Sequence, residues 1–433
     1  QRVSQQHKPV GVAPRVTQAV PFRWKAYGGL VTAASWLHYA VLSRFSNSDE
    51  GGAAWFSKRL NPALPQAATG RRIWIHAVSA GESKVAELLR KRLLALDPTL
   101  SVVLSATTYS GYARVRAIAG DASSFIMPLD TLEAQRRILE TVRPDLLVLV
   151  ESEFWPAQFA AAQAAGVPVV VVNATMSPRS FARHQRNRAV ADRTLAKAQR
   201  IYAQDEAIAA RYAELGVPGE GIEVIGNLKL VPLSSAPAAG KDAPPLVVFG
   251  NVHRDEIERL APAIAELRAR RPDIRLVLVP RYPGKIPGEV LSASFGAELA
   301  IVDSEAAIAG AGGPVWLDEM GTLSKLYARA TIGVVCGTFS PIGGHDLSEP
   351  LHLGAASVYG PHVERQNPLH QALSAIGCAV QVGSADDLPQ VLVGLLEDAP
   401  RRRQMIEAFR SVADQATTRL DALATSLVAE VGN

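Results

Sequence analysis

Residues 76–82 have the composition of a turn that presents a carboxylate. A short apolar run ends at Val78, small residues and Gly81 allow a tight turn, and a helix is predicted to start near Glu82 or Ser83. The helix dipole favours the ionised form of a carboxylate in the first turn. An ionised carboxylate facing a cleft can act as a general base toward an attacking hydroxyl. A plain helix-capping role for Glu82 is the alternative that these residues leave open.

Two carboxylates, Glu151 and Glu153, directly follow another predicted strand. Their alternate spacing places them on the same side of an extended chain. Phe154-Trp155-Pro156 comes next, and the proline suits the first turn of a helix. The pair could bind a metal, form a second acid/base site, or belong to a network that orients a neighbouring histidine or arginine. One isolated pair of carboxylates is a weak indication of a metal site.

A basic cluster follows the next predicted strand. Residues 173–180 include Arg179 and lead into four further basic side chains, Arg183, His184, Arg186 and Arg188. Arginine can bind phosphate through paired N–H donors, so the cluster could hold an anionic acceptor. The alternative is a solvated helix face, which runs of basic residues usually form.

Polar segments also follow predicted strands in the second half of the chain, at residues 279–283, 318–323 and 337–350. Gly343 and Gly344 allow the backbone to approach a ligand closely. Glu349 stands before Pro350, which suits a helix start, where N–H groups can bind phosphate and a nearby carboxylate can bind ribose hydroxyls. A nucleotide site and a plain connecting turn both fit these residues. The G-x-G-x-x-G and Walker spacings are absent, which disfavours NAD-dependent dehydrogenases and P-loop enzymes.

The elements that must position these segments are short apolar runs alternating with helix-length amphipathic stretches. Such runs are typical of strands buried on both faces of a parallel sheet. They lie at residues 73–78, 102–104, 146–150, 169–172, 201–203, 246–249, 274–279, 300–302, 315–317, 332–336 and 357–359. The alternation predicts an α/β fold of two Rossmann-like domains. Ligands of such sheets bind beyond the carboxyl ends of the strands, which directs the search to a cleft between the domains.

A stretch rich in Pro, Ser and Ala interrupts the alternation and is predicted to be a linker between the domains. The predicted organisation is a flexible lead over 1–20, a membrane-proximal helical segment over 21–60, a first domain over 61–228, a linker over 229–245, a second domain over 246–410 and a C-terminal helix over 411–433.

Composition excludes several classes of protein. The 433 residues are 48% hydrophobic and 20% charged, which argues against disorder and coiled coil. The net charge of +4 is too small to indicate nucleic acid binding by itself. Cys336 and Cys378 lie far apart, so neither a disulfide scaffold nor a structural zinc site is expected, and a reducing compartment is favoured.

The stretch 27–42 is nearly free of charge and has basic residues on both sides. It is shorter than the roughly 20 residues needed to cross a bilayer upright. It starts too late for a cleaved signal peptide and lacks a clean cleavage site. Aromatic side chains suited to the headgroup level are Trp24, Tyr27, Trp36 and Tyr39. The stretch is therefore predicted to be a monotopic or single N-terminal membrane anchor, or a helix packed on the protein's own core.

Seven segments occur in the order found in the Kdo transferases of lipopolysaccharide biosynthesis, which the chain resembles over about residues 20–430. They are residues 76–82, 151–156, 173–180, 226–229, 279–283, 318–323 and 343–350. The resemblance implies a GT-B glycosyltransferase that moves Kdo (3-deoxy-D-manno-oct-2-ulosonic acid) from CMP-Kdo to a lipid A precursor or related glycolipid. It implies an inverting, metal-independent reaction without a cofactor, at the cytoplasmic face of the bacterial inner membrane.

The resemblance also implies roles for individual residues. Glu82 matches the family's general base, Arg281 matches the arginine that neutralises the departing CMP phosphate, and Glu349 would hold the ribose. Residues expected to line the sugar-nucleotide site are Met320, Gly321, Gly337, Thr338, Gly343, Gly344, His345 and Asp346. Residues expected on the acceptor side of the cleft are Ser79, Gly81, Glu153, Arg179, Ser180 and Lys229.

The chain departs from the family pattern in residues 173–177, which lack the usual arginine, in residues 250–256, at Tyr282 and at Asp346. Asp346 replaces a neutral amide. Its charge is expected to weaken binding of a sugar nucleotide that carries a phosphate and a carboxylate, unless Arg254, Arg281 or a shifted pose compensates.

The departures leave several alternatives open. One is a divergent paralogue that uses another CMP-activated ulosonic acid or nucleotide sugar and a different acceptor. Another is a sugar epimerase of the same architecture. A third is a non-catalytic paralogue that binds a glycolipid.

Overall fold

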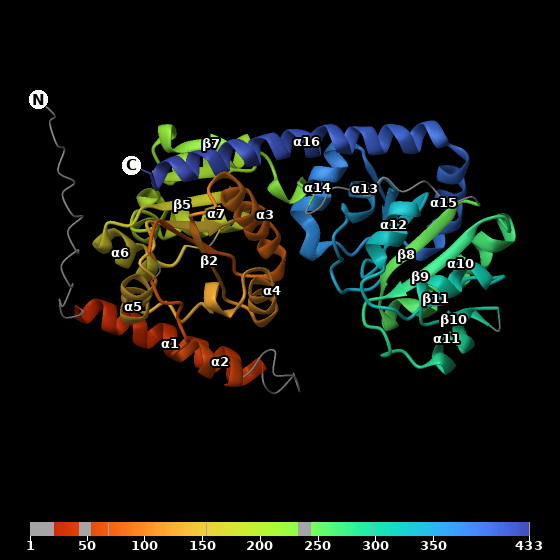
Figure 1. Ribbon diagram of the computed structural model, residues 1–433, viewed down its shortest axis with the longest axis horizontal. Coiled ribbons are helices and arrows are strands. Elements are labelled where there is room, and N and C mark those ends of the chain that lie inside the picture. The colour runs from red at the N-terminus through yellow and green to blue at the C-terminus, as the bar shows by residue number, and fades with distance from the viewer. Residues whose placement is uncertain are drawn as a thin grey trace, which may run out of the picture.

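The computed structural model describes residues 21–42, 53–67, 69–152, 154–232, 244–296 and 298–432. The predicted lead over 1–20, most of the predicted linker, and Glu153 lie outside the described residues. Figure 1 shows two α/β domains side by side, with a long C-terminal helix running along both.

The first domain is built on a parallel sheet that has, within the described residues, seven strands in the order β3-β2-β1-β4-β5-β6-β7. The strands are β1 (Arg72–His76), β2 (Ser101–Ala106), β3 (Ser124–Ile126), β4 (Leu146–Val150), β5 (Val169–Ala174), β6 (Arg200–Ala203) and β7 (Ile222–Val224). The helices are α3 (Ala80–Leu96), α4 (Tyr109–Ala119), α5 (Leu132–Val142), α6 (Pro156–Ala165), α7 (Pro178–Arg186), α8 (Arg188–Ala191) and α9 (Glu206–Glu214). The central strands β1 and β4 are buried throughout, as their apolar runs predict.

The second domain repeats this plan, with described strands in the order β10-β11-β9-β8-β12-β13-β14. The strands are β8 (Leu246–Val252), β9 (Arg275–Pro280), β10 (Ala300–Val302), β11 (Val315–Leu317), β12 (Ile332–Val335), β13 (Ala356–Tyr359) and β14 (Ala379–Gln381). The helices are α10 (Ile257–Arg270), α11 (Gly288–Phe295), α12 (Leu323–Arg329), α13 (Glu349–His352), α14 (Asn367–Ile376), α15 (Leu388–Glu397) and α16 (Ala399–Glu430). The predicted α/β fold with two Rossmann-like domains is confirmed.

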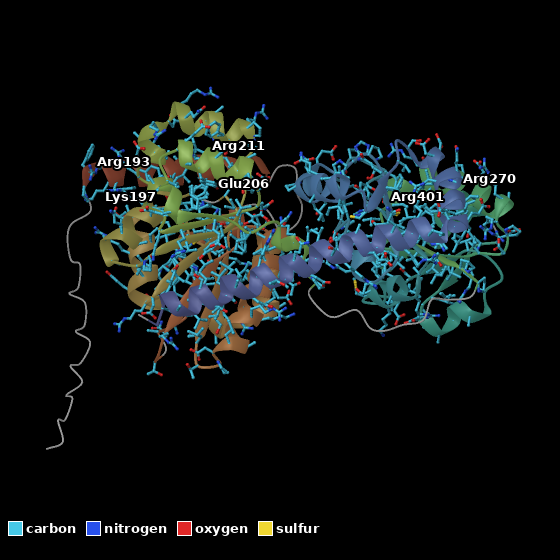
Figure 2. All side chains as sticks on the ribbon, turned by 90° about the horizontal axis from the view of Figure 1, so that it is seen from above. Arg193, Lys197, Glu206, Arg211, Arg270 and Arg401 are labelled. Carbon is cyan, nitrogen blue, oxygen red and sulfur yellow. The ribbon has the colours of Figure 1, made fainter. Side chains whose placement is uncertain are left out.

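Helix α16 begins in the second domain and returns across the first. Leu420, Leu423 and Leu427 belong to the same core cluster as Val85 and Leu89 of α3. Figure 2, seen from above, shows α16 lying across both domains, with Arg401 at its start over the second. The predicted C-terminal helix over 411–433 is therefore part of a longer helix that joins the two domains.

Two N-terminal helices, α1 (Phe22–Leu42) and α2 (Ala53–Leu60), pack beneath the first domain (Figure 1). The Tyr27 hydroxyl donates to Asp130 Oδ2 at 2.8 Å, and the Trp55 indole N–H donates to the Thr107 carbonyl at 3.1 Å. Thr107 and Asp130 follow β2 and β3. Both helices therefore lie at the carboxyl ends of the strands, the edge of a parallel sheet where ligands bind.

Helix α1 has one buried and one exposed face. Trp24 and Tyr27 pack against the core of the first domain. The large apolar side chains that point outward are Phe22, Leu30, Trp36 and Leu37, which are 85%, 72%, 60% and 60% exposed. Within the described ranges, no helix combines the length and apolar character needed to cross a membrane.

Candidate active site

Glu82 lies in the first turn of α3, directly after the turn that ends β1. Ser79 caps the helix, and its hydroxyl donates to Glu82 Oε1 at 3.0 Å. The other carboxylate oxygen accepts the Val78 backbone N–H at 2.7 Å. The Ser79 hydroxyl oxygen also accepts the Glu82 N–H at 3.5 Å, so the contacts with Ser79 and Val78 orient both carboxylate oxygens. Glu82 is only partly buried and neighbouring Gly81 is exposed, so the carboxylate remains open to a ligand.

Helix α4 supports this turn from the side. The Thr108 hydroxyl and backbone N–H both donate to the Val78 carbonyl, at 3.1 and 3.0 Å. A Cβ on Gly111 would lie 2.8 Å from that carbonyl oxygen, so only glycine allows α4 to approach so closely. Thr108 and Gly111 were not predicted as site residues, because their contacts with the Val78 carbonyl depend on how α4 packs against the turn.

Lys229 pairs with Glu151 at the carboxyl end of β4. Lys229 Nζ lies 2.5 Å from Glu151 Oε1, with both side chains mostly buried. Asn173, at the end of β5, donates to the same carboxylate oxygen at 3.5 Å and accepts the Leu228 N–H at 2.9 Å. Glu151 and Asn173 both have positive φ, 65° and 53°, a strained backbone state that tends to mark functional sites. Of the two carboxylates considered in the sequence, Glu151 therefore orients a lysine and not the expected histidine or arginine, and Glu153 lies outside the described residues.

Arg179 and Ser180 lie in the first turn of α7. Ser177 caps the helix by accepting the Ser180 N–H at 3.1 Å. A surface hollow is lined by Ser177, Arg179, Ser180, Arg183, Arg186 and Asn187. The three arginines give this hollow a concentrated positive charge. It suits a phosphate-bearing ligand, and an exposed basic helix face remains the alternative.

The second domain brings two histidines together at the strand ends. His253, just after β8, and His345 face each other with their Nε2 atoms 2.8 Å apart and their rings nearly parallel. Burial, and then the neighbouring positive charges, lower the pKa of His345 to about 4 and also lower the pKa of His253. The rings are therefore neutral near pH 7, and one Nε2–H donates to the other Nε2.

The direction of this hydrogen bond depends on which nitrogen of each neutral ring carries the proton, and the ring that accepts it carries its own proton on Nδ1. The backbone of His253 is fixed independently, because its carbonyl accepts the Glu256 N–H at 3.1 Å and its N–H donates to Glu256 Oε2 at 3.0 Å. Arg281 and Arg365 are the cations that act on both rings. His253 and Arg365 were not predicted as site residues, although His253 stands at a position that fits the family motif.

Glu256 holds the loop that follows β12. Its side chain is fully buried and accepts the N–H groups of His253 at 3.0 Å and Phe339 at 2.9 Å. Gly337 has φ 75°, and a Cβ there would lie 2.8 Å from the His345 ring, so glycine lets the ring approach. Thr338 is fully buried, and its hydroxyl donates to the Val335 carbonyl and accepts the Gly360 N–H. Thr338 therefore shapes the loop from within.

Glu349 is the first residue of α13 and accepts the Ser324 hydroxyl at 3.1 Å. Burial, followed by the nearby negative charge of Asp346, raises the pKa of Glu349. Ser324 lies in the first turn of α12, after Met320 and Gly321, which are both exposed. These residues thus surround the start of two short helices, where a nucleoside could be bound through its hydroxyls.

The charge of Asp346 is compensated, but by a different cation from those expected. Its Oδ2 lies 2.9 Å from Nζ of Lys84, which belongs to α3 of the other domain. Its Oδ1 accepts the Ser348 hydroxyl at 2.6 Å and the Ser348 N–H at 3.0 Å. Burial alone would raise the pKa of Asp346, but the Lys84 and Ser348 contacts outweigh it and hold the pKa well below its usual range. The compensating cation is Lys84, and the sequence analysis had named Arg254 and Arg281.

The predicted residues therefore form four groups. In the second domain, Gly337, His345 and the loop of Gly343 and Gly344, at φ 97° and 87°, lie at the histidine pair, on which the charge of Arg281 acts. Glu82, Ser79 and Gly81 form the second group, which the Lys84–Asp346 pair joins to the first. Arg179 and Ser180 line the separate hollow on α7, and Lys229 forms the fourth group with Glu151. Among the described residues, no cluster of three or more histidine, cysteine or acidic side chains is arranged to hold a metal ion.

Several solved structures share this fold. The chain matches the glycotransferase of kitacinnamycin with a TM-score of 0.52 and 14% identity, over 85% of this chain and 100% of that one. It matches MnaA of S. aureus, solved with UDP, with a TM-score of 0.51 and 16% identity, over 78% and 91% of the two chains. At these identities the matches show the fold alone, which is the GT-B arrangement of two Rossmann-like domains.

Sequence relatives define the family. Residues 54–231 match the family model described as 3-deoxy-D-manno-octulosonic-acid transferase (kdotransferase). The 3-deoxy-D-manno-octulosonic acid transferase of Bordetella pertussis is 31% identical over 375 residues, covering 81% of this chain and 86% of that protein. The enzyme of the same name from Chlamydophila psittaci is 28% identical over 360 residues, covering 80% and 82%. The chain therefore belongs to the 3-deoxy-D-manno-octulosonic acid transferases, a family of glycosyltransferases.

Proposed function

We propose that the protein transfers Kdo from CMP-Kdo to a lipid A precursor or a related lipid acceptor, by a single inverting displacement that needs no metal. The observation that carries the proposal is the pairing of Lys84 with Asp346 across the two domains. This contact joins the turn that bears Glu82 to the loop that bears His345, beside Arg281. A base and a cationic site are thus held on opposite sides of one domain junction.

The charges of the second domain support a donor with two anionic groups. CMP-Kdo carries a phosphate and a carboxylate. Arg281 and Arg365 can bind anions, and arginine is well suited to paired contacts with phosphate or carboxylate oxygens. Glu349 accepts hydrogen bonds and would hold the ribose hydroxyls. Asp346 does not oppose this binding, because its charge is neutralised by Lys84.

The chemistry assigned to these groups balances without a metal. Glu82 takes the proton of the acceptor hydroxyl as that oxygen forms a bond to C2 of Kdo. The bond between C2 and the CMP phosphate oxygen breaks, and CMP leaves with both electrons of that bond. Arg281 stabilises the charge that develops on the phosphate. Attack on the face opposite the departing phosphate inverts the configuration at C2.

The first domain suits a lipid acceptor. The exposed apolar face of α1, with Phe22, Leu30 and Leu37, would rest in the headgroup region of the cytoplasmic face of the inner membrane. Helices α1 and α2 dock at the carboxyl ends of β2 and β3. The arginines of α7 would bind phosphate groups of the acceptor. In this arrangement the acceptor hydroxyl reaches Glu82 from the membrane side.

A transfer assay tests the proposal. Purified protein is mixed with CMP-Kdo, generated in situ, and a lipid A precursor in detergent, and the lipid is analysed by mass spectrometry. A gain of one or more Kdo units supports the proposal, and the anomeric configuration of the product, measured by NMR, reports inversion. Transfer must persist in the presence of a strong chelator. Folded protein that binds CMP but leaves the lipid unchanged refutes the proposal, and other CMP-activated ulosonic acids and acceptors are then the substrates to test.

A further inference from the structure

The ion pair of Lys84 and Asp346 occupies an unusual position. Lys84 lies two residues after Glu82, just beyond the first turn of α3, and Asp346 directly follows His345. The Lys84 side chain is only 12% exposed and that of Asp346 is 35% exposed, so the pair is partly shielded from water. Shielding strengthens an ion pair relative to an exposed one, whose contribution is typically small.

The Asp346 carboxylate is oriented on both sides. Ser348 binds Oδ1 through its hydroxyl and its backbone N–H, which leaves Oδ2 directed at Lys84. The rest of the loop is also fixed, because the Gly344 N–H donates to the Gly337 carbonyl and the Arg365 N–H donates to the Gly343 carbonyl. The position of the Asp346 side chain therefore determines the position of the loop that carries His345.

Packing continues beside the pair. Leu347 and Leu351 of the second domain share a core cluster with Val85 and Leu89 of α3. Apolar packing is not directional, so by itself it would let the second domain slide along α3. A single short ion pair at its edge fixes the register between the first turn of α3 and the loop.

We propose that Lys84 and Asp346 are positioning residues that hold the sugar-nucleotide loop, residues 343–346, against the first turn of α3 and so set the distance between Glu82 and the bound donor. This inference rests on the proposed function of the same site. The family pattern that the chain resembles has an amide at position 346, so the pair is a feature of this sequence. The Asp346 carboxylate binds Lys84 of the opposite domain.

Four variants test the role in transfer: Lys84→Met, Asp346→Asn, the two combined, and the reversal Lys84→Glu with Asp346→Lys. Each single change should lower kcat about tenfold, with the KM for the lipid acceptor unchanged. The combined neutral variant should lose no more than the worse single variant, because both changes remove the same contact. The reversal should recover at least half of the lost rate. The matched control is the double variant Arg92→Met, Asp421→Asn. That 2.9 Å pair also involves α3, which it joins to α16, but it is exposed to solvent. The kcat of this control should stay within twofold of the wild type.

A purely structural role predicts a different pattern. If the variants melt at lower temperature but keep the wild-type kcat per folded molecule, or if the losses of the single variants add, the positioning role is wrong. Failure of the reversal to restore any rate contradicts it as well.

The contact itself can be tested without activity. A zero-length carbodiimide joins a carboxylate to an amine only when they touch, so wild-type protein should yield a peptide cross-linked between Lys84 and Asp346, and Lys84→Met should not. Absence of this cross-link overturns the inference. A wild-type protein that cross-links but transfers no Kdo refutes the proposed function, whereas an active wild type with unaffected variants refutes the positioning role alone.

Discussion

His253 and His345 show how one contact between two side chains defines a binding group. The Nε2 atoms of the two rings share one hydrogen bond, and the buried Glu256 carboxylate fixes the backbone of His253. The ring that accepts this hydrogen bond keeps its own N–H donor on Nδ1, and the charge of Arg281 acts on both rings. An anionic group of the sugar nucleotide would meet a donor of fixed orientation, with no side-chain rearrangement needed on binding.

Replacing His253 with phenylalanine keeps a ring in place and removes the hydrogen bond to His345. One net hydrogen bond contributes about 1 kcal/mol, so the KM for the sugar nucleotide should rise about fivefold while kcat changes by less than twofold. His370→Phe is the control, because His370 contacts Tyr359 in the same domain, outside the predicted site. The nitrogen-15 shifts of His345 should also change from those of a single tautomer to those of a mixture. An unchanged KM and an unchanged His345 spectrum would contradict the assignment.

At the scale of elements, the two faces of α1 differ: the inner face packs on the first domain, and the outer face is the one proposed to contact lipid. Its inner face is fixed to the first domain through Tyr27 and Asp130, and burial raises the pKa of Asp130 to about 6. Asp130 also accepts the N–H groups of Ala157 and Gln158, in the first turn of α6, at 2.9 and 3.0 Å. The outer face can therefore rest on a lipid surface while α1 stays attached to the strand ends.

The double variant Leu30→Ser, Leu37→Ser should bind more weakly to vesicles of phosphatidylethanolamine and phosphatidylglycerol. Each leucine that leaves water contributes about 2 kcal/mol, so the partition coefficient of the double variant, measured by vesicle sedimentation, should fall at least 30-fold. The fold should not change, since both side chains point into solvent. Ile301→Ser, an exposed site on β10 of the second domain, is the matched control. Equal partitioning of the double variant and the wild type would show that α1 does not face lipid.

The elements were predictable where the pattern was long enough. Runs such as 146–150 and 169–172 predict central strands, because both faces of a parallel strand are buried. Strands β3, β7 and β14 were missed, since each has three residues of which one is polar, whereas β10, an edge strand of the same length, is apolar throughout and was predicted. The full length of α16 was also missed, because only its packing on α3 shows that it belongs to both domains.

The placement of a single motif at a strand end could be predicted, as with Glu82 after β1 and Arg281 after β9, and the roles of both residues stay predictions. Contacts between distant segments could not be predicted. Lys84 and Asp346 are 262 residues apart, and His253 and His345 are 92 apart. No local sequence pattern marks either pair. The two histidines come together through the strand order of the second sheet, and Lys84 meets Asp346 only because of how the two domains are placed.

At the scale of the whole molecule, the two domains are joined at separate places. Helix α16 fastens to the first domain through Leu420, Leu427 and the 3.2 Å contact between Tyr202 and Ser426. Lys84 and Asp346 join the domains at the start of α3. Two separate attachments restrict how the domains can rotate, which keeps the start of α3, with Glu82, against the loop that carries Asp346.

The measurement that tests the central claim most directly compares Glu82→Gln with Glu87→Gln in single-turnover Kdo transfer, alongside CMP binding by calorimetry. Glutamine at position 82 can keep the hydrogen bond from the Val78 N–H but cannot take a proton, and Glu87 lies on the same helix within ion pairs to Lys91 and Arg114. The account predicts that Glu82→Gln slows transfer at least 100-fold, the range expected for loss of a general base, while CMP affinity stays within twofold. Glu87→Gln should transfer at nearly the wild-type rate. Near-normal transfer by Glu82→Gln, or equal loss of transfer and CMP binding, would show that Glu82 only caps α3 and that the base lies elsewhere.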